Sequence, residues 1–343
     1  MWPHLPPLFS ETSLWELPRP NFSPYSPPLK CQGIKTRLVS WIAQQLRWDG
    51  KGHWLEPFLG SGVVLFNVRP PRALVTDSNP HIIAFYHALQ KGELSPRMVQ
   101  TYLLEEGRRL RQYGETHYHV IRERFNRAPN PLDFLFLNRT AFNGIIRFNR
   151  KGHFNVPFCQ KPERFDRAHI TRIVNQVTRA QQLLQSHDWQ LCHADWRDCL
   201  ATAKADDFAY LDPPYPGRHT DYYQKWGKTE SETLARVLAT LPCGYALSMW
   251  QSDACRHNPH LSLYTTGMVV RTVPHFYHVG SRRIFRHAVQ EALVIKPGFQ
   301  NPNTVAALSP ESFSVEPAGR PSEKNMEYLE PDTVYGRNKP AGS

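Results

Sequence analysis

The stretch Trp54-Leu55-Glu56-Pro57-Phe58-Leu59-Gly60-Ser61-Gly62 has the pattern of a short strand that runs into a glycine loop. An apolar segment at 63–68 and a second strand pattern at 73–77 follow the loop, and the second strand ends on Asp77. This order of strand, glycine loop, helix, strand and acid predicts a doubly wound α/β sheet.

The same loop suggests a ligand site. Glycine lets a ligand approach the backbone closely, and the carboxylate of Glu56 beside the loop can accept a hydrogen bond from an amine. Asp77 lies 15 residues after Gly62, near the spacing at which an acid accepts from ribose hydroxyls. An ordinary strand-to-helix turn with a solvated Asp77 is the alternative. The loop lacks a full GxGxxG and a GKS or GKT, which disfavours dinucleotides and nucleoside triphosphates.

Farther along the chain, strands and helices continue to alternate, with one interruption. Helical spacing predicts helices at 36–46, 79–89 and 170–184, and apolar runs predict strands at 188–192, 208–212, 244–249, 268–273 and 291–295. The interruption, 91–164, is basic and mostly helical, with patches at 97–111, 115–127 and 131–137. We therefore expect an α/β domain, 29–90 and 165–297, that carries an inserted helical domain. The proline-rich ends, 1–28 and 298–343, are expected to be an irregular leading segment and a mobile tail.

Composition and charge narrow the class of protein. Apolar residues make up 41% and charged residues 21%, which is typical of a folded chain. The net charge is +11, and residues 97–172 alone carry 15 basic and 7 acidic side chains, which favours a polyanionic partner. The mean hydropathy is −0.51, and no apolar run approaches the roughly 20 residues of a membrane span. Six cysteines without CxxC spacing and sixteen histidines without a ligand-spaced cluster predict no metal. We expect a soluble, cytoplasmic protein.

A second motif, Asp212-Pro213-Pro214-Tyr215, directly follows the apolar strand pattern 208–211. Two prolines fix the backbone and remove two N–H donors, so the Asp212 carboxylate and the Pro213 carbonyl can both accept from an exocyclic amino group. The ring of Tyr215 can stack on the base that carries this group. A rigid proline turn is the structural alternative, but the glycine loop and Asp77 upstream favour the chemical interpretation.

With both motifs in this order, residues 29–297 resemble the Dam-type adenine-N6 DNA methyltransferases, the class α family with a DPPY motif. The segment 29–35 matches the family's LKWxGGK, with Cys31 in place of Trp and Ile34 in place of the second Gly. The segment 56–62 matches EPFxGxG. The resemblance implies a Rossmann-like catalytic domain that binds S-adenosylmethionine. The cofactor-binding residues that it implies are Cys31, Lys35, Glu56, Pro57, Phe58, Gly60, Gly62, Asp77, Asp195 and Asp212.

The inserted domain carries a third match. Residues 137–158 follow the family pattern LNRxxxNGxxRxN…GxFNVPF, which forms a hairpin that enters DNA. By this match Phe142 is the aromatic wedge, Asn143 and Arg147 contact DNA, and the target site is GATC-like. An apolar wedge can fill the gap left by a flipped base, and arginine can read a guanine edge. Without the motif, Phe142 would be assigned to the core. The DNA-binding residues that the resemblance and the charge pattern suggest are Lys30, Arg139, Phe142, Asn143, Arg147 and Asn149.

These matches imply transfer of a methyl group from S-adenosylmethionine to N6 of a flipped adenine in double-stranded DNA. The implied catalytic residues are Asp212, Pro213, Pro214 and Tyr215. Methylation of RNA or of cytosine N4 and a non-catalytic DNA-binding role on the same fold are the alternatives. We further expect a monomer, and the candidate partner beside DNA is a cognate restriction endonuclease encoded nearby, with this protein as the modification component of a restriction-modification system.

Overall fold

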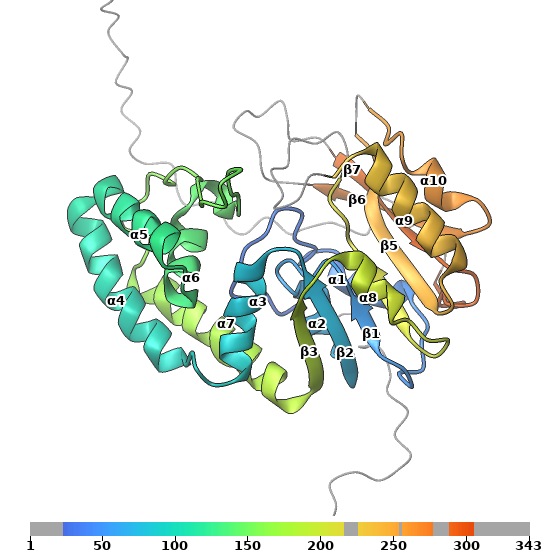
Figure 1. The fold of residues 1–343 in the computed structure, drawn as a ribbon, viewed down its shortest axis with the longest axis horizontal. Helices are drawn as coiled ribbons and strands as arrows, with labels where there is room; N and C mark the ends of the chain where they lie inside the picture. Colours follow the sequence, from blue (N-terminus) through green and yellow to red (C-terminus); the bar gives the residue numbers. More distant parts are fainter. Residues whose placement is uncertain (1–22, 216–225, 254–255, 277–287, 305–343) are drawn as a thin grey trace, which may run out of the picture. The chain divides into compact units, whose positions relative to one another are not determined.

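Seven strands form one mixed sheet in the order β3-β2-β1-β4-β5-β7-β6 (Figure 1). The computed structural model describes residues 23–215, 226–253, 256–276 and 288–304; most of the two proline-rich ends lies outside them. Each strand falls where the apolar pattern predicts one, and the α/β fold class is confirmed. The strands are β1 (Trp54–Glu56), β2 (Arg72–Asp77), β3 (Asp188–His193), β4 (Phe208–Leu211), β5 (Gly244–Ser252), β6 (Val269–Phe276) and β7 (Ala288–Ile295).

The strand order places the two motifs side by side. From β1 the sheet grows through β2 to β3 on one side and through β4 to β5 on the other, with all five strands parallel. β7 is antiparallel to both β5 and β6. The order therefore reverses between β1 and β4, and ligands bind open α/β sheets at the carboxyl ends of the strands flanking such a reversal. The glycine loop follows β1, and Asp212 follows β4.

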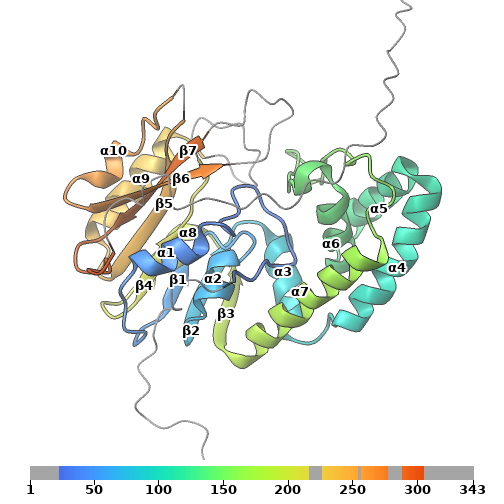
Figure 2. The same ribbon diagram turned by 180° about the vertical axis from the view of Figure 1, so that it is seen from behind.

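Helices cover both faces of the sheet. In Figure 1 α8 (Trp196–Ala201) and α9 (Lys228–Thr240) lie in front of the strands, whereas in Figure 2 α1 (Val39–Gln45) and α2 (Val63–Val68) lie in front. Alternate residues of β1 join different hydrophobic clusters, Trp54 on the α1–α2 side and Leu55 on the α8–α9 side. This alternation is the two-residue period of a strand buried on both faces. The short α10 (Ser262–Thr265) joins the second cluster through Tyr264.

Three helices begin at a polar residue followed by proline. α3 (Pro80–Gln90), α4 (Pro96–Tyr113) and α6 (Pro131–Thr140) start after Asn79, Ser95 and Asn130, whose side chains accept from backbone N–H groups of the first turn. The proline ring fixes a helical φ at a position whose N–H has no partner inside the helix. Local chemistry therefore sets where these helices begin.

The insertion forms a helical unit beside β3. α4, α5 (Glu115–Arg127) and α6 lie next to α3 and the long α7 (Arg167–Ser186) in both views (Figures 1 and 2). α4 packs on α7, and α6 packs on α3. Buried residues of the insertion, such as Leu103 and Phe125, belong to the same hydrophobic cluster as Trp54 of the sheet. The inserted helices thus share a core with the sheet.

Candidate active site

The glycine loop turns the chain sharply from β1 into α2. Gly62 has φ +71°, a left-handed conformation, and it precedes the first residue of α2. A Cβ atom built on Gly62 would lie 2.7 Å from Cε2 of Phe66, so both the backbone and the packing require glycine. This tight turn leaves the Gly60 N–H directed at Asp77.

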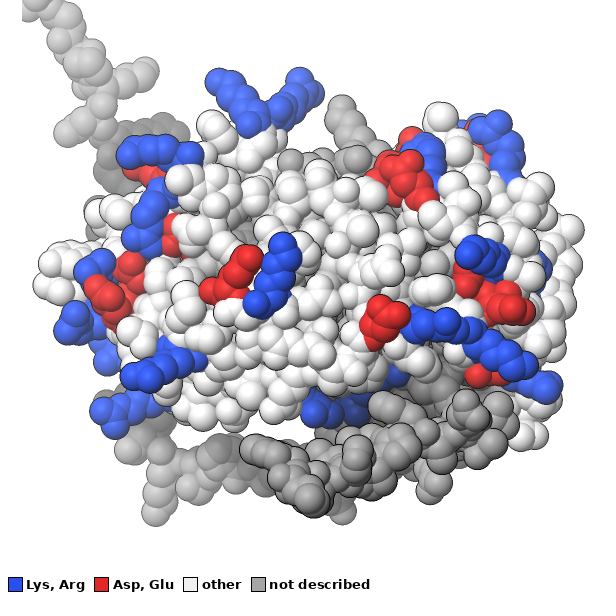
Figure 3. Space-filling model, turned by 60° about the horizontal axis from the view of Figure 1, so that its bottom comes forward, with Lys and Arg blue, Asp and Glu red and all other residues white. Residues whose placement is uncertain are grey.

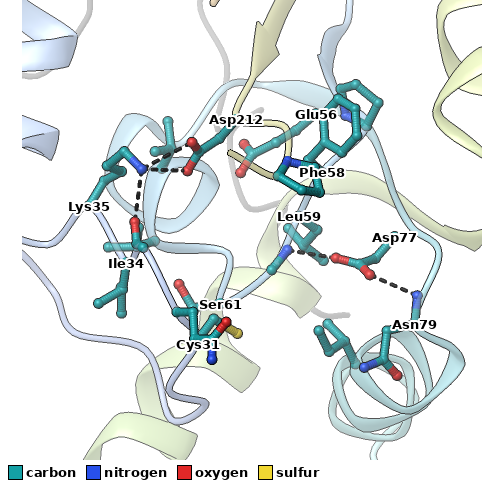
Figure 4. Close-up of a pocket in the computed structure, with 18 of the residues that line it drawn as sticks. Cys31, Ile34, Lys35, Glu56, Phe58, Leu59, Ser61, Asp77, Asn79 and Asp212 are labelled. Carbon is teal, nitrogen blue, oxygen red and sulfur yellow. Dashed lines mark hydrogen bonds and ion pairs between the residues drawn. The ribbon is translucent and has the colours of Figure 1, made fainter. Parts of the chain in front are cut away.

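Asp77 is held by backbone donors at the end of β2. One carboxylate oxygen accepts from Gly60 N and the other from Asn79 N, both at 2.8 Å (Figure 4). Burial raises the pKa of Asp77, and the two N–H groups oppose that shift. The side chain lines a cavity with about 1150 Å³ of space, counting its open mouth. Glu56, Phe58, Gly60, Ser61 and Asp212 line the same cavity.

Asp212 lies across the cavity from Asp77 and forms an ion pair with Lys35. The Lys35 Nζ lies 3.0 and 2.9 Å from the two Asp212 oxygens and 2.8 Å from the Gly33 carbonyl oxygen (Figure 4). Lys35 is 1% exposed, so this ammonium is well shielded from water. Burial raises the pKa of Asp212, and the Lys35 charge opposes that shift. Lys35, which the resemblance assigned to the cofactor, therefore contacts the Asp212 carboxylate directly.

Tyr215 connects Asp212 to a buried acid that the sequence analysis missed. Its hydroxyl lies 3.3 Å from Asp212 Oδ1 and 3.0 Å from Oε2 of Glu291 on β7, and the Lys35 ammonium lies 4.9 Å from its ring centroid. Glu291 is 1% exposed, and its charge adds to the rise in the pKa of Asp212. The available signal was a carboxylate at the start of the apolar run 292–295. Pro214 also lines the cavity, whereas Pro213 is buried.

Glu56 is a third acid of the cavity, and it is buried. Burial raises its pKa to about 8, with the Asp212 charge adding to the shift and the Trp54 indole N–H, 2.9 Å from Oε2, opposing it. A cationic partner strongly stabilises the charged form of a desolvated carboxyl group of this kind.

Cys31 lines the cavity as well, and burial raises the pKa of its thiol, which disfavours the nucleophilic thiolate.

Three aromatic rings line another part of the cavity. Phe58 stacks on Trp196 at 6.4 Å between centroids and meets Trp226 edge-on at 5.5 Å. Aromatic faces of this size suit a purine ring. Asp195, which the resemblance assigned to the cofactor, is the N-cap of α8, where it accepts from the Arg197 N–H and forms an ion pair with that side chain. The adjacent Trp196, not Asp195, is among the residues that line the cavity.

The expected wedge is exposed. Phe142, Asn143 and Gly144 form a single 3-10 turn, here called the wedge loop, and Phe142 is 46% exposed. Asn143 has φ +54°, and its side chain is also exposed. The exposed ring meets the geometric requirement of the expected wedge, because an apolar side chain must reach solvent to enter a base stack.

Three other expected DNA contacts already form hydrogen bonds within the protein. Arg147 is half-buried, and it donates from Nε to Asn155 Oδ1 and from Nη2 to Asn155 O, both at 2.9 Å, which orients its guanidinium. Asn149 accepts from the backbone N–H groups of Lys151 and His153, so its amide oxygen already holds the hairpin turn. Arg139 is only 4% exposed, because α6 turns it toward Gln176 of α7 rather than toward solvent.

The described residues contain neither a candidate membrane span nor a candidate metal site. No helix there combines the length and apolar character of a membrane span. Within the same ranges, no three His, Cys, Asp or Glu side chains are grouped so that they could hold a metal ion.

The reversed sheet order, the glycine loop and the acids at the ends of β1, β2 and β4 define a Rossmann-like methyltransferase. A family model described as D12 class N6 adenine-specific DNA methyltransferase matches residues 32–277. The chain belongs to this family.

Relatives from three organisms are consistent with that membership. The chain is 31% identical to the retron Ec67 DNA adenine methylase of Escherichia coli over 61% of this chain and 71% of that protein. It is 32% identical to a DNA adenine methylase of Vibrio cholerae over 54% of this chain and 64% of the relative. The type II methyltransferase M.MjaIII of Methanocaldococcus jannaschii is 28% identical over 55% of this chain and 68% of its own length.

Proposed function

We propose that this protein transfers a methyl group from S-adenosylmethionine to N6 of an adenine that has been flipped out of duplex DNA. The observation that carries the proposal is the shared cavity of Glu56, Asp77 and Asp212, at the ends of three neighbouring parallel strands. Membership of an adenine-specific DNA methyltransferase family supports the target base. The names of the relatives, two DNA adenine methylases and a type II methyltransferase, support DNA as the substrate.

The cavity has donors and acceptors that suit S-adenosylmethionine. Glu56 would accept from its amino group, Asp77 from its ribose hydroxyls, and the rings of Phe58, Trp196 and Trp226 would contact its adenine. When bound, the cofactor supplies an activated methyl group on a sulfonium. Glu56 in its charged form would also favour the positive charge of this ligand.

Asp212 would prepare the amino group of the target base. The lone pair of adenine N6 is delocalised into the ring, and a hydrogen bond to the Asp212 carboxylate favours the more tetrahedral nitrogen that can attack. A carboxylate has about four lone-pair directions, so the contacts with Lys35 leave positions for an N–H donor. Lys35 and Tyr215 fix where those positions point. Positioning and electrostatics of this kind can provide much of the rate.

Nucleoside analysis tests the proposal. The protein is incubated with labelled S-adenosylmethionine and, in separate reactions, with mixed-sequence duplex DNA or RNA, which is then digested to nucleosides and analysed by mass spectrometry. We expect label on N6 of adenine with the native protein and none with Asp212→Ala, which should still bind DNA. Label on cytosine N4 would overturn the target base, and label only in RNA would overturn the substrate. Cofactor binding without transfer to any nucleic acid would overturn the activity.

A further inference from the structure

Glu291 of β7 is a buried acid that belongs to none of the sequence motifs. On the face shown in Figure 3, Asp and Glu side chains reach the surface and lie beside Lys and Arg side chains. Glu291 is only 1% exposed, and the three residues that follow it, Ala292, Leu293 and Val294, are buried and apolar. Burying a carboxylate in such surroundings costs free energy, so the stability of the sheet alone does not favour an acid at this position.

The strand register places Glu291 beside the end of β4. The last residue pair between β4 and β5 is at Leu247 of β5. Glu291 lies opposite Trp250, which is three residues farther along β5. Its side chain therefore lies at the level where the chain leaves β4 through Asp212, although β7 comes much later in the sequence.

The hydroxyl of Tyr215 lies between the carboxyl groups of Glu291 and Asp212. Its oxygen is 3.0 Å from Oε2 of Glu291 and 3.3 Å from Oδ1 of Asp212. A phenol has a single proton, so it can donate a full hydrogen bond to only one of these acceptors at a time. The shorter distance favours Glu291. Donation to Asp212 would instead occupy Oδ1, an oxygen that Lys35 already contacts at 3.0 Å.

The ring of Tyr215 is held by packing. Tyr215 is 7% exposed and belongs to the same hydrophobic cluster as Leu211 of β4 and Met249 of β5. The Lys35 ammonium lies 4.9 Å from the ring centroid, which adds a cation–π contact. Because the ring is held, rotation of the O–H bond alone decides which carboxyl group receives the proton.

We propose that Glu291 is a positioning residue for methyl transfer, which holds the phenolic proton of Tyr215 away from Asp212. The proposal rests on the proposed function, in which Asp212 accepts from the amino group of the target base. With the phenolic proton on Glu291, the Asp212 carboxylate keeps an acceptor direction for that amino group. Without Glu291, the hydroxyl would turn to Asp212 and compete with the base, which slows a reaction that depends on orientation.

The effect should be confined to the rate of transfer. Glu291 is not among the residues that line the cavity, so it would contact neither the cofactor nor the base. Its action on the reaction passes through Tyr215 and Asp212. Loss of Glu291 should therefore slow the chemical step and leave the binding of both ligands unchanged.

Single-turnover kinetics test the proposal. The protein is mixed in excess with duplex DNA that the native protein methylates and with saturating labelled S-adenosylmethionine. The rate of transfer is measured beside the Kd of each ligand. For Glu291→Gln, whose amide is a weaker acceptor, we expect about tenfold slower transfer, with both Kd values within about twofold of the native ones. Glu291→Leu has no acceptor, and transfer should be slower still.

Glu93→Gln is the matched control. It makes the same chemical change at an exposed acid that follows α3, at the edge of the sheet away from the cavity, and it should leave the rate of transfer unchanged. A rate in the two Glu291 variants equal to that of the control would overturn the proposal.

A double-mutant cycle tests whether Glu291 acts through Tyr215. Tyr215→Phe removes the hydroxyl and keeps the ring. In this background Glu291→Gln should slow transfer by less than about twofold, because no phenolic proton remains to be held. A further loss as large as in the native background would overturn the proposal, because Glu291 would then act by another route.

Two other outcomes are distinct. A lower melting temperature or a loss of cofactor binding in Glu291→Gln would overturn the proposal in favour of a structural role for Glu291. A native protein that binds S-adenosylmethionine and methylates no nucleic acid would instead overturn the proposed function.

Discussion

Glu56 is 2% exposed, and burial raises its pKa to about 8. At neutral pH the protonated form therefore predominates in the free protein. A ligand that places a cationic amine beside this carboxyl group binds the ionised form, so binding releases a proton. The affinity for S-adenosylmethionine should rise almost tenfold per pH unit between about pH 6 and pH 7.5, and the rise should stop near the pKa of the free protein.

Calorimetry at several pH values checks this linkage. In two buffers with different ionisation enthalpies, the apparent binding enthalpy should differ by the amount that one released proton predicts near pH 6. In Glu56→Gln the side chain cannot ionise. This variant should bind S-adenosylmethionine more weakly than the native protein, and its affinity should change little with pH over the same range. A native protein with pH-independent affinity and no proton release would show that Glu56 is already charged or does not contact the amine.

The sequence predicted which acids line the cavity better than it predicted which side chains contact them. Glu56, Asp77 and Asp212 were found because short motifs place them at the ends of strands. Lys35 and Asp212 are 177 positions apart, and Tyr215 and Glu291 are 76 apart, so both contacts depend on the sheet order. No local pattern contains that order. Asn149 has a local contact that the motif did not indicate, because its amide oxygen accepts from backbone N–H groups of a nearby turn, while its role toward DNA stays a prediction.

Among the elements, the three helices of the insertion are joined by a charged network. Arg124 of α5 contacts the buried Asp133 of α6 at 2.9 Å and the buried Glu106 of α4 at 3.2 Å. Arg124→Ala would leave both carboxylates without this cation, and removing one partner of a buried ion pair is strongly destabilising. We expect a loss of about 3 kcal/mol in the free energy of unfolding, measured by urea denaturation.

Arg127→Ala is the matched control for this prediction. Arg127 lies on the same helix, is exposed and has no ion pair with the described residues, so its loss should change stability by less than about 0.5 kcal/mol. A similar small effect for both variants would mean that water already screens the half-exposed Arg124.

For the molecule as a whole, the continuous core predicts that the insertion and the sheet unfold together. Phe125 and Phe134 of the insertion belong to the same hydrophobic cluster as Phe85 of α3 and Trp54 of β1. Separating the insertion would expose that shared surface, at about 25 cal/mol for each Å² of apolar area. Because the insertion cannot separate from the sheet without this cost in free energy, we expect the two to unfold together.

Tryptophan fluorescence can test this coupling because none of the nine tryptophans lies in 91–164. Fluorescence therefore follows the rest of the chain, while hydrogen exchange of α5 peptides follows the insertion. If the two unfold together, Arg124→Ala should shift the urea midpoint seen by fluorescence, although the substitution is in the insertion. Fluorescence that keeps its native midpoint while α5 exchanges faster would show that the insertion opens alone. The wedge loop would then be carried by a unit that moves independently of the cavity.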